Sequence, residues 1–443
     1  MPKETQNDAG CTSELFTVIE IGTETVKVLI GGRASEAKKN QKPAICIYGI
    51  GKAISNNTGE GSMPLNIRKG EIINVDKVRQ QIELAIQEAE ADSAMDVRDT
   101  NLYVGISGKG IHSENIEATV SVKDRHVTSE DLLNAQVIAY EKGYSELQDK
   151  LIQVSMRYFK TEQGITYDVS NQVTRNLHAY TQAAVCTSNQ KYFTLKRMIK
   201  EATACSEPIF LYTPTLPCHA KIDELEREKH SLFIDIGAGL TSFAITSKPG
   251  IIEFGHIPIG CNHIENDLML GLEIDWEAAT HVVRRLKSIM DEYHSDNGTK
   301  TVRLRHKGGQ KEREVPMESI ISIVETRVEE IFQLVKKELL TRNSWDLIHG
   351  TVFISGGGAL LPEICATASR VLELPAEIAR PGEDIDSTTS KDFLEDPRWI
   401  APIGMMRMAI TQHELNEGLK DSNVNQGSVI DIIRKFSRII LNW

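Results

Sequence analysis

The fold is decided by one stretch, Ser231-Leu232-Phe233-Ile234-Asp235-Ile236-Gly237-Ala238-Gly239-Leu240-Thr241-Ser242-Phe243. A short apolar run ends in Asp235, a Gly-Ala-Gly turn follows, and a second β-type run covers 243–246, which together predict a β-hairpin. Small turn residues let backbone N–H groups approach a ligand closely, and such amides form an anion-binding concavity. The carboxylate of Asp235 stands where it would hold a metal-bound water.

The same pattern occurs once more, near the N-terminus, in the stretch Thr17–Ile30, whose acid is Glu20. Glu20 and Asp235 are 215 positions apart (235 minus 20), and a pattern repeated at that spacing suggests a duplicated lobe. Either hairpin alone is equally well explained as an exposed turn, whereas two facing hairpins would grip a polyphosphate from both sides. The predicted phosphate-side residues are Glu20, Gly22, Thr23, Glu24, Asp235, Gly237, Ala238, Gly239 and Leu240.

A third glycine turn lies in the stretch Thr351–Pro362, which predicts a strand, three consecutive glycines and the start of a helix. Such a turn places N–H groups at a helix N-terminus, where they bind anions. The alternative is a tight turn needed only for packing, but three consecutive glycines exceed what packing usually requires. Gly356, Gly357 and Gly358 are therefore predicted to contact the ligand.

The composition excludes several classes of protein. The chain has 443 residues, 40% of them hydrophobic, which suffices for two or more lobes with their own cores. Its formal net charge of −12 argues against a general nucleic-acid binder. The seven cysteines show no CxxC and no Cys/His metal spacing, which is typical of reduced thiols in a cytosolic protein. With no signal peptide and no run long enough to span a bilayer, membrane contact is expected to be peripheral.

The C-terminal segment 429–443 is amphipathic and follows a polar stretch, 413–428, that predicts a flexible linker. On a helical wheel one face is apolar and the other carries cations that reach anionic lipid head groups, which is typical of an interfacial helix. The alternatives are a helix packed on the protein's own core and a helix docked in a partner's groove. The residues predicted to bind the membrane are Val429, Ile432, Ile433, Arg434, Lys435, Phe436, Arg438, Ile439, Ile440 and Trp443.

Two further stretches belong with these features. They are Leu-Tyr-Val-Gly-Ile-Ser-Gly-Lys-Gly-Ile at 102–111 and Gly-Glu-Ile-Ile-Asn at 70–74. Together with the hairpins and the tail, they make the chain resemble FtsA, the bacterial actin-like family of cell division, from about Phe16 to Trp443. The resemblance implies an α/β, two-lobed, actin-like (ribonuclease-H-like, duplicated) ATPase fold with an inserted α+β subdomain 1C and a C-terminal amphipathic helix. It also implies ATP and Mg²⁺ in the cleft between the lobes, with Glu20 and Asp235 holding Mg²⁺ through water.

The resemblance divides the chain into subdomains. The expected divisions are a disordered N-terminus (1–14), subdomain 1A (15–96, 179–228 and a closing helix in 383–412), inserted subdomain 1C (97–178), subdomain 2A (229–274 and 344–382), subdomain 2B (275–343), the linker (413–428) and the membrane-targeting helix (429–443). Within 2B, helices are predicted at 276–293 and at Met317–Leu340, and the apolar stripe of the second, longer helix is typical of a core-facing surface.

The resemblance further implies an ATP-binding cell division protein that polymerises on the cytoplasmic membrane and anchors FtsZ filaments there. Its location would be peripheral, on the cytoplasmic face of the membrane at the division septum. The implied partners are the FtsZ C-terminal peptide, other copies of the chain in a filament, later divisome membrane proteins and an anionic lipid bilayer, but no nucleic acid. Subdomain 2B would bind the FtsZ peptide, with Arg327, Glu330 and Lys336 as the candidate surface.

The phosphate hairpins depart from the family pattern. Glu20 stands where the family usually has Asp, and Ala238 replaces a glycine of the second turn. Leu240 and Ser242 replace a threonine and an aspartate, which removes a hydroxyl and a carboxylate that help position a metal or attacking water. Backbone amides can still bind phosphate, so we expect ATP binding with hydrolysis that is slow or absent.

On the ribose side, the family usually offers Glu and Lys from a helix after Asp267. Here the alignment places Thr280 and Val283 at those positions, with Arg284 nearby and Glu277 as another substitute. Two rival interpretations stay open: an ATPase or phosphotransferase of the same superfamily, and an actin-like protein of pilus assembly or cell shape. The tethered tail argues against a metabolic enzyme, which needs no interfacial helix.

Overall fold

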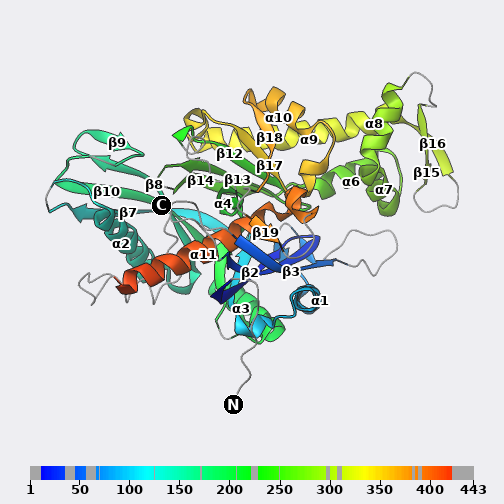
Figure 1. Cartoon of the computed structure of the whole chain (residues 1–443). Helices are drawn as coiled ribbons and strands as arrows, with labels where there is room; N and C mark the ends of the chain where they lie inside the picture. The colour runs from blue at the N-terminus through cyan, green and yellow to red at the C-terminus, as the bar shows by residue number, and fades with distance from the viewer. Residues whose placement is uncertain are drawn as a thin grey trace, which may run out of the picture.

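The computed structural model describes residues 11–34, 45–55, 66–68, 70–123, 125–169, 172–205, 207–220, 228–248, 250–295, 300–306, 312–381, 385–387 and 392–421. These residues form two lobes, each built on a β-sheet, and a smaller sheet inserted into the first lobe (Figure 1). None of the described helices is both long enough and apolar enough to cross a membrane. The predicted membrane helix, 429–443, lies outside the described residues.

The first lobe has a six-stranded sheet in the order β11-β6-β1-β2-β3-β19. Its strands are β1 (Cys11–Ile21), β2 (Thr25–Ala34), β3 (Ile45–Ile54), β6 (Asn101–Ile106), β11 (Ile209–Tyr212) and β19 (Ile385–Ser387). Helices α1 (Val75–Ser93) and α3 (Asn189–Thr203) pack together on one side, and α11 (Ile400–Asp421) packs with the short α4 (Pro217–Ala220) on the other (Figure 1). A small hairpin, β4 (Ile67–Arg68) and β5 (Glu71–Ile72), precedes α1.

The second lobe has a five-stranded sheet in the order β14-β13-β12-β17-β18. Its strands are β12 (Leu232–Ile236), β13 (Thr241–Ser247), β14 (Gly250–Ile257), β17 (Val352–Ser355) and β18 (Ala376–Ile378). The lobe also contains α6 (Cys261–Gly271), α7 (Trp276–Arg284), α8 (Leu286–His294), α9 (Met317–Thr341), α10 (Ile364–Leu372) and the hairpin β15 (Thr301–Arg305) with β16 (Glu312–Pro316). The predicted apolar stripe of α9 is buried in this lobe's core, as expected.

The two lobes place their acids at equivalent points of equivalent sheets. Glu20 pairs across the hairpin with Lys27 and lies beside Gly105 of the parallel strand β6. Asp235 pairs in the same way with Ser242 and lies beside Ser355 of the parallel strand β17. The shared register shows that the repeated sequence pattern reflects a repeated fold.

The insert in the first lobe is a four-stranded antiparallel sheet with its own core. It contains β7 (Ile111–Ser121), β8 (Leu151–Thr161), β9 (Gly164–Thr166) and β10 (Asn176–Cys186), with α2 (Ser129–Leu147) packed against it. It begins and ends at one place, because the amide of Thr187 donates to the carbonyl of Gly110 at 2.8 Å.

The structure places the insert later in the chain than the predicted range 97–178. Strand β6 belongs to the main sheet of the first lobe, and β10, which runs to Cys186, belongs to the insert. The sequence identifies both segments as strands, but a strand pattern does not say which sheet supplies the neighbouring strand.

Three other elements differ from prediction. Strand β1 already begins at Cys11, within the range expected to be disordered, because it pairs with Ala34 of β2. Helix α11 continues to Asp421, so 413–421 is helical rather than a flexible linker; this stretch contains no proline, and its one glycine costs only about 1 kcal/mol. The helix expected over 276–293 is divided at Arg285 into α7 and α8.

Candidate functional site

The candidate site is a cleft between the two lobes, with a volume of about 440 Å³. The first hairpin, the second hairpin and the three-glycine turn all contribute to its lining. Ten of the predicted ligand-side residues line it together: Glu20, Gly22, Thr23, Glu24, Asp235, Gly237, Ala238, Leu240, Gly356 and Gly357. Residues more than 300 positions apart in sequence, such as Glu20 and Gly356, thus converge on one cavity.

The two hairpin turns have the same backbone geometry. The amide of Gly22 donates to the carbonyl of Thr25 at 3.0 Å, and the amide of Gly237 donates to the carbonyl of Leu240 at 2.9 Å. A Cβ atom at Gly22 would lie 2.7 Å from the Thr25 carbonyl oxygen, so only glycine fits this turn. Each turn exposes small residues and their backbone to the cleft, which suits close contact with an anion.

The structure gives Gly239 and Gly358 packing positions outside the cleft lining. A Cβ atom at Gly239 would lie 2.8 Å from the hydroxyl oxygen of Thr23, so the two hairpins meet at this point. A Cβ atom at Gly358 would lie 2.4 Å from the side chain of Ile236. These two glycines let the lobes and the three-glycine turn approach closely, while Gly356 and Gly357 face the cavity.

The two acids differ in their partners. Glu20 forms an ion pair with the ammonium of Lys27 at 2.6 Å. Asp235 accepts a hydrogen bond at 2.6 Å from the hydroxyl of Ser355. Burial and the negative charge of nearby Glu20 raise the pKa of Asp235 to about 6. The cleft therefore disfavours two ionised acids side by side, and a cation placed between them would relieve the repulsion.

Leu240 and Ser242 occupy the positions where the second hairpin departs from the pattern that its sequence resembles. Ser242 lies directly opposite Asp235 in the hairpin and is almost fully buried. The backbones of Gly70 and Gly108 approach each other closely, since a Cβ atom at Gly70 would lie 2.4 Å from the Gly108 Cα atom. The Leu240 side chain packs at the same place, 2.7 Å from that Cβ position. An apolar contact between elements thus replaces the hydroxyl that would face a phosphate.

Magnesium fits this site only in company with a polyphosphate. Among the described residues there is no group of three or more His, Cys, Asp and Glu side chains that could hold a metal ion. Mg²⁺ usually binds through one or two carboxylates together with phosphate oxygens and waters. Glu20 and Asp235 supply two such carboxylates, so the donor set becomes complete when phosphates arrive with the ion.

The far end of the cleft is formed by α6 and α7. Thr280, Val283 and Arg284 line it, as the alignment of the sequence predicts, while Glu277 lines an adjoining cavity of about 350 Å³. Glu265 of α6 also lines this end of the cleft and was not predicted from the sequence. Burial and the charge of Glu24 raise the pKa of Glu265 to about 7. Glu265 lies one helical turn after Cys261, the first residue of α6, and this spacing is the feature of the sequence that could have indicated it.

Two basic residues of the cleft were also missed. Lys52 of β3 lies next to Lys27 in the strand register, and Arg398 lies just before α11. Burial and the nearby Arg398 lower the pKa of Lys52. Together with Lys27 and Arg284, they give the cavity four cations near its acids and amides, a composition suited to a polyanion.

The residues predicted to bind a partner peptide lie on α9, away from the cleft lining. Arg327 pairs with Asp267 at 2.5 Å and also with Glu330. Lys336 pairs with Glu373 at 3.1 Å and lies 5.0 Å from the ring centre of Trp345. Arg327 and Glu330 form one cluster, while Lys336 belongs to a second cluster farther along the helix.

Comparison with known sequences identifies relatives of the chain. A family model described as Cell division protein FtsA matches residues 232–404. The FtsA protein of Borreliella burgdorferi is 25% identical over 422 residues, covering 92% of this chain and 94% of the relative. The FtsA protein of Neisseria meningitidis serogroup B is 26% identical over 399 residues, covering 89% of this chain and 90% of the relative. The chain is thus similar to these cell division proteins over most of its length.

Comparison with solved structures identifies the fold. A chain of the PilM-PilN type IV pilus biogenesis complex matches with a TM-score of 0.57 and 14% identity, covering 90% of this chain and 99% of that one. MreB 5 of Spiroplasma citri bound to AMPPNP matches with a TM-score of 0.52 and 15% identity, covering 93% of this chain and 99% of the MreB 5 chain. At these identities the likeness shows the fold alone, and it confirms the two-lobed, actin-like architecture.

Proposed function

We propose, from the premise that this chain is an actin-like relative of the FtsA cell division proteins, that it binds ATP and tethers FtsZ filaments to the cytoplasmic membrane. The observation that carries the nucleotide part is the meeting of both hairpins and the glycine turn in one cleft. Its backbone amides suit phosphates, and its two acids suit a nucleotide-bound Mg²⁺. The adenosine end would lie against Glu265, Thr280 and Arg284.

ATP hydrolysis is expected to be slow. In-line phosphoryl transfer depends on positioning the attacking group and stabilising charge. In this cleft Leu240 packs against another element, and Ser242 offers only a short hydroxyl beside Asp235. We expect mant-ATP to bind and turnover to stay below the roughly 1–100 s⁻¹ of phosphoryl-transfer enzymes. A turnover within that range would instead favour the ATPase or phosphotransferase interpretation.

The tethering part assigns two roles to the chain outside the cleft. The segment 429–443 would insert its apolar face into an anionic bilayer at the division septum. The α9 surface with Arg327, Glu330 and Lys336 would bind the FtsZ C-terminal peptide, and the chain would form filaments on the membrane. The insert would recruit later divisome proteins.

Binding of a labelled FtsZ C-terminal peptide, followed by fluorescence anisotropy, tests the tethering proposal directly. We expect saturable binding that Arg327→Glu weakens, because this change reverses the charge of one cluster on α9. The control is Arg197→Glu on α3 in the first lobe, which reverses the charge of an arginine whose ion pair with Glu201 is exposed. Folded protein that binds no peptide would contradict the tether and favour the pilus or cell-shape alternative.

A further inference from the structure

A second cavity, separate from the nucleotide cleft, lies within the first lobe. Its volume is about 400 Å³, within the range of small-molecule pockets. It opens between the β4–β5 hairpin, the turn after β6 and the first two turns of α3. Among the described lining residues it shares only Ile21 and Ser107 with the nucleotide cleft, so the two cavities adjoin at these two residues.

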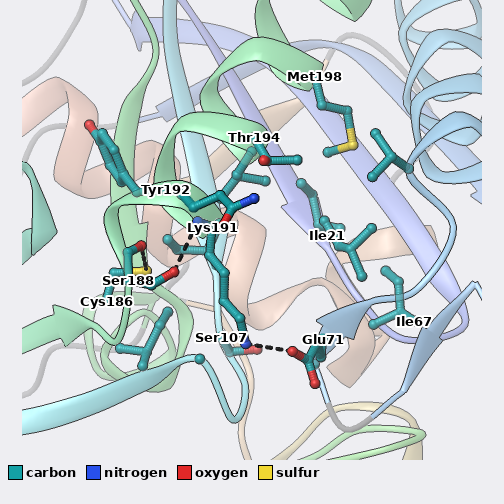
Figure 2. Close-up of a pocket in the computed structure, with 18 residues that line it drawn as sticks. Ile21, Ile67, Glu71, Ser107, Cys186, Ser188, Lys191, Tyr192, Thr194 and Met198 are labelled. Carbon is teal, nitrogen blue, oxygen red and sulfur yellow. Dashed lines mark hydrogen bonds and ion pairs between the residues drawn. The ribbon is translucent and has the colours of Figure 1, made fainter.

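The interior of this pocket is aliphatic. Figure 2 shows Ile21, Ile67 and Met198 on one side of it, and Ile72, Val75 and Leu195 add further apolar surface. Burial of apolar area in such a pocket contributes about 25 cal/mol per Å². The interior therefore favours a flexible or planar hydrocarbon body over a sugar or a nucleotide.

The rim of the pocket carries an excess of positive charge. Lys191, in the first turn of α3, pairs with Glu71 of β5 at 2.5 Å (Figure 2). Lys109 lies at the same rim, because it precedes the lining residue Gly110, where a Cβ atom would lie 3.9 Å from the ammonium nitrogen of Lys191. The hydrogen bond and the charge of Lys191, and to a smaller extent the charge of Lys109, lower the pKa of Glu71. The rim thus carries two ammonium groups near one carboxylate, and a ligand carboxylate would balance the second.

The ion pair at the rim is easily exchanged. Both side chains are about half exposed, 47% for Lys191 and 40% for Glu71, and exposed pairs of this kind contribute little to stability. A ligand carboxylate can share or take over Lys191 without leaving a buried charge. The Lys191 backbone is held in place, since its amide donates to the Ser188 hydroxyl at 3.1 Å.

We propose that this pocket binds a small amphipathic carboxylate, with its hydrocarbon chain among the isoleucines and its carboxylate on Lys191. Neither half of such a molecule suffices alone. A short carboxylate would meet a solvent-screened ion pair, and an uncharged chain would leave the excess positive charge at the rim unmatched. The proposal does not rest on the proposed nucleotide and peptide binding.

Isothermal titration of the full chain with decanoate, kept below its micelle-forming concentration and without nucleotide, tests the site. We expect saturable binding of one decanoate per chain, with decanol binding more weakly and acetate not at all. Lys191→Met should weaken decanoate binding by roughly fivefold, the effect of one partly exposed ion pair. Ile72→Trp should abolish it, because the larger side chain enters the cavity from a half-exposed position.

The matched control is Lys200→Met on the same helix, whose ammonium pairs with Glu207 at 2.9 Å outside the pocket. It should leave decanoate binding unchanged, and Glu207 keeps its second partner, Lys196. If Ile72→Trp does not fold, Lys191→Met decides the matter. Binding that is absent, that is unsaturable, or that responds equally to Lys191→Met and Lys200→Met would overturn the proposal.

Discussion

Glu253 of the second lobe and Arg157 of the insert form an ion pair at 3.3 Å across 96 residues of sequence. The same carboxylate accepts from Gln182 of the insert at 2.6 Å and from Arg342, after α9, at 2.9 Å. The Glu253 side chain is only 4% exposed. The insert therefore belongs to the first lobe by sequence but is fastened to the second lobe by a buried carboxylate.

Replacing this carboxylate should loosen the insert. Glu253→Gln leaves the mostly buried Arg157 without its counter-charge and leaves Arg342 with Glu338 alone, and such losses cost about 2–4 kcal/mol. We expect a corresponding fall in the free energy of unfolding, measured with urea. Faster amide hydrogen exchange in β8 and β10 should show that the insert opens first.

The control for this change is Asp168→Asn. Asp168 pairs with Lys248 at 2.6 Å and also joins the insert to the second lobe, but both side chains are exposed. It should leave exchange in β8 and β10 unaltered, since solvent screens exposed pairs. Equal effects of the two variants would contradict the special role of Glu253.

Asp235→Asn should stabilise the protein at neutral pH while impairing ligand binding. The pKa of Asp235 is raised to about 6 from its ordinary 3.8, so the folded state binds the proton more tightly than the unfolded state. Stability from this group is fully present below pH 3.8 and is lost as pH rises through about 6. The variant removes that loss, so we expect a gain of about 3 kcal/mol at pH 8 and none near pH 3.5.

Urea unfolding at both pH values measures this difference. The amide side chain introduced by Asp235→Asn has nearly the same size and keeps an oxygen that can accept the hydrogen bond of Ser355. The difference in stability between the two proteins should therefore reflect the charge of Asp235 and not a lost contact. Equal stability of the two proteins at pH 8 would show that Glu20 and burial do not act on Asp235 as described.

Gly357→Ala should separate ligand binding from folding. A Cβ atom at Gly357 meets no protein atom within 4 Å and would point into open space, so stability should stay within about 0.5 kcal/mol. A nucleotide lying against this turn would meet the methyl group, and we expect about tenfold weaker mant-ADP binding, or about 1.4 kcal/mol.

Gly356→Ala provides the contrast. Gly356 has φ of +82°, and a Cβ there would lie 2.6 Å from the carbonyl oxygen of Ile236. That variant should lose both stability and nucleotide binding. Unchanged mant-ADP affinity in Gly357→Ala would place the nucleotide away from this turn.

The tail should carry membrane binding by itself. Deleting 429–443 should abolish co-sedimentation with anionic liposomes and leave the thermal melting of the body, followed by circular dichroism, unchanged. Ile433→Glu should weaken binding because it puts a charge on the apolar face, whereas Asn442→Glu on the polar face should weaken it far less. Liposome binding that survives the deletion would assign the membrane contact to another surface.

Local patterns in the sequence were enough to predict most of the cleft. Asp235 and Glu20 end apolar strands before small turns, and these features reveal a hairpin without knowledge of its neighbours. Glu265, Lys52 and Arg398 could not be found in this way. They reach the cleft only because α6, β3 and the start of α11 pack around it, so their roles follow from tertiary structure.

The same reason explains the misplaced insert. Both β6 and β10 are predicted as strands from their sequences, yet one pairs with β1 of the main sheet and the other with β7 and β8. The Glu253 cluster was equally invisible, because its members come from 157, 182, 253 and 342. A lone glutamate among apolar residues of β14 was the only trace of it in the sequence.

The hydrogen bond between Thr187 and Gly110 marks the point where the insert interrupts a repeated unit of the fold. Strand β6, helix α3 and the parallel strand β11 form a single crossover unit, and the insert enters and leaves it at that bond. In the second lobe, β17, α10 and the parallel strand β18 form the corresponding unit without interruption. A chain spliced from Gly110 to Thr187 would therefore give the first lobe the same uninterrupted crossover as the second lobe, at the cost of the insert's contacts with Glu253.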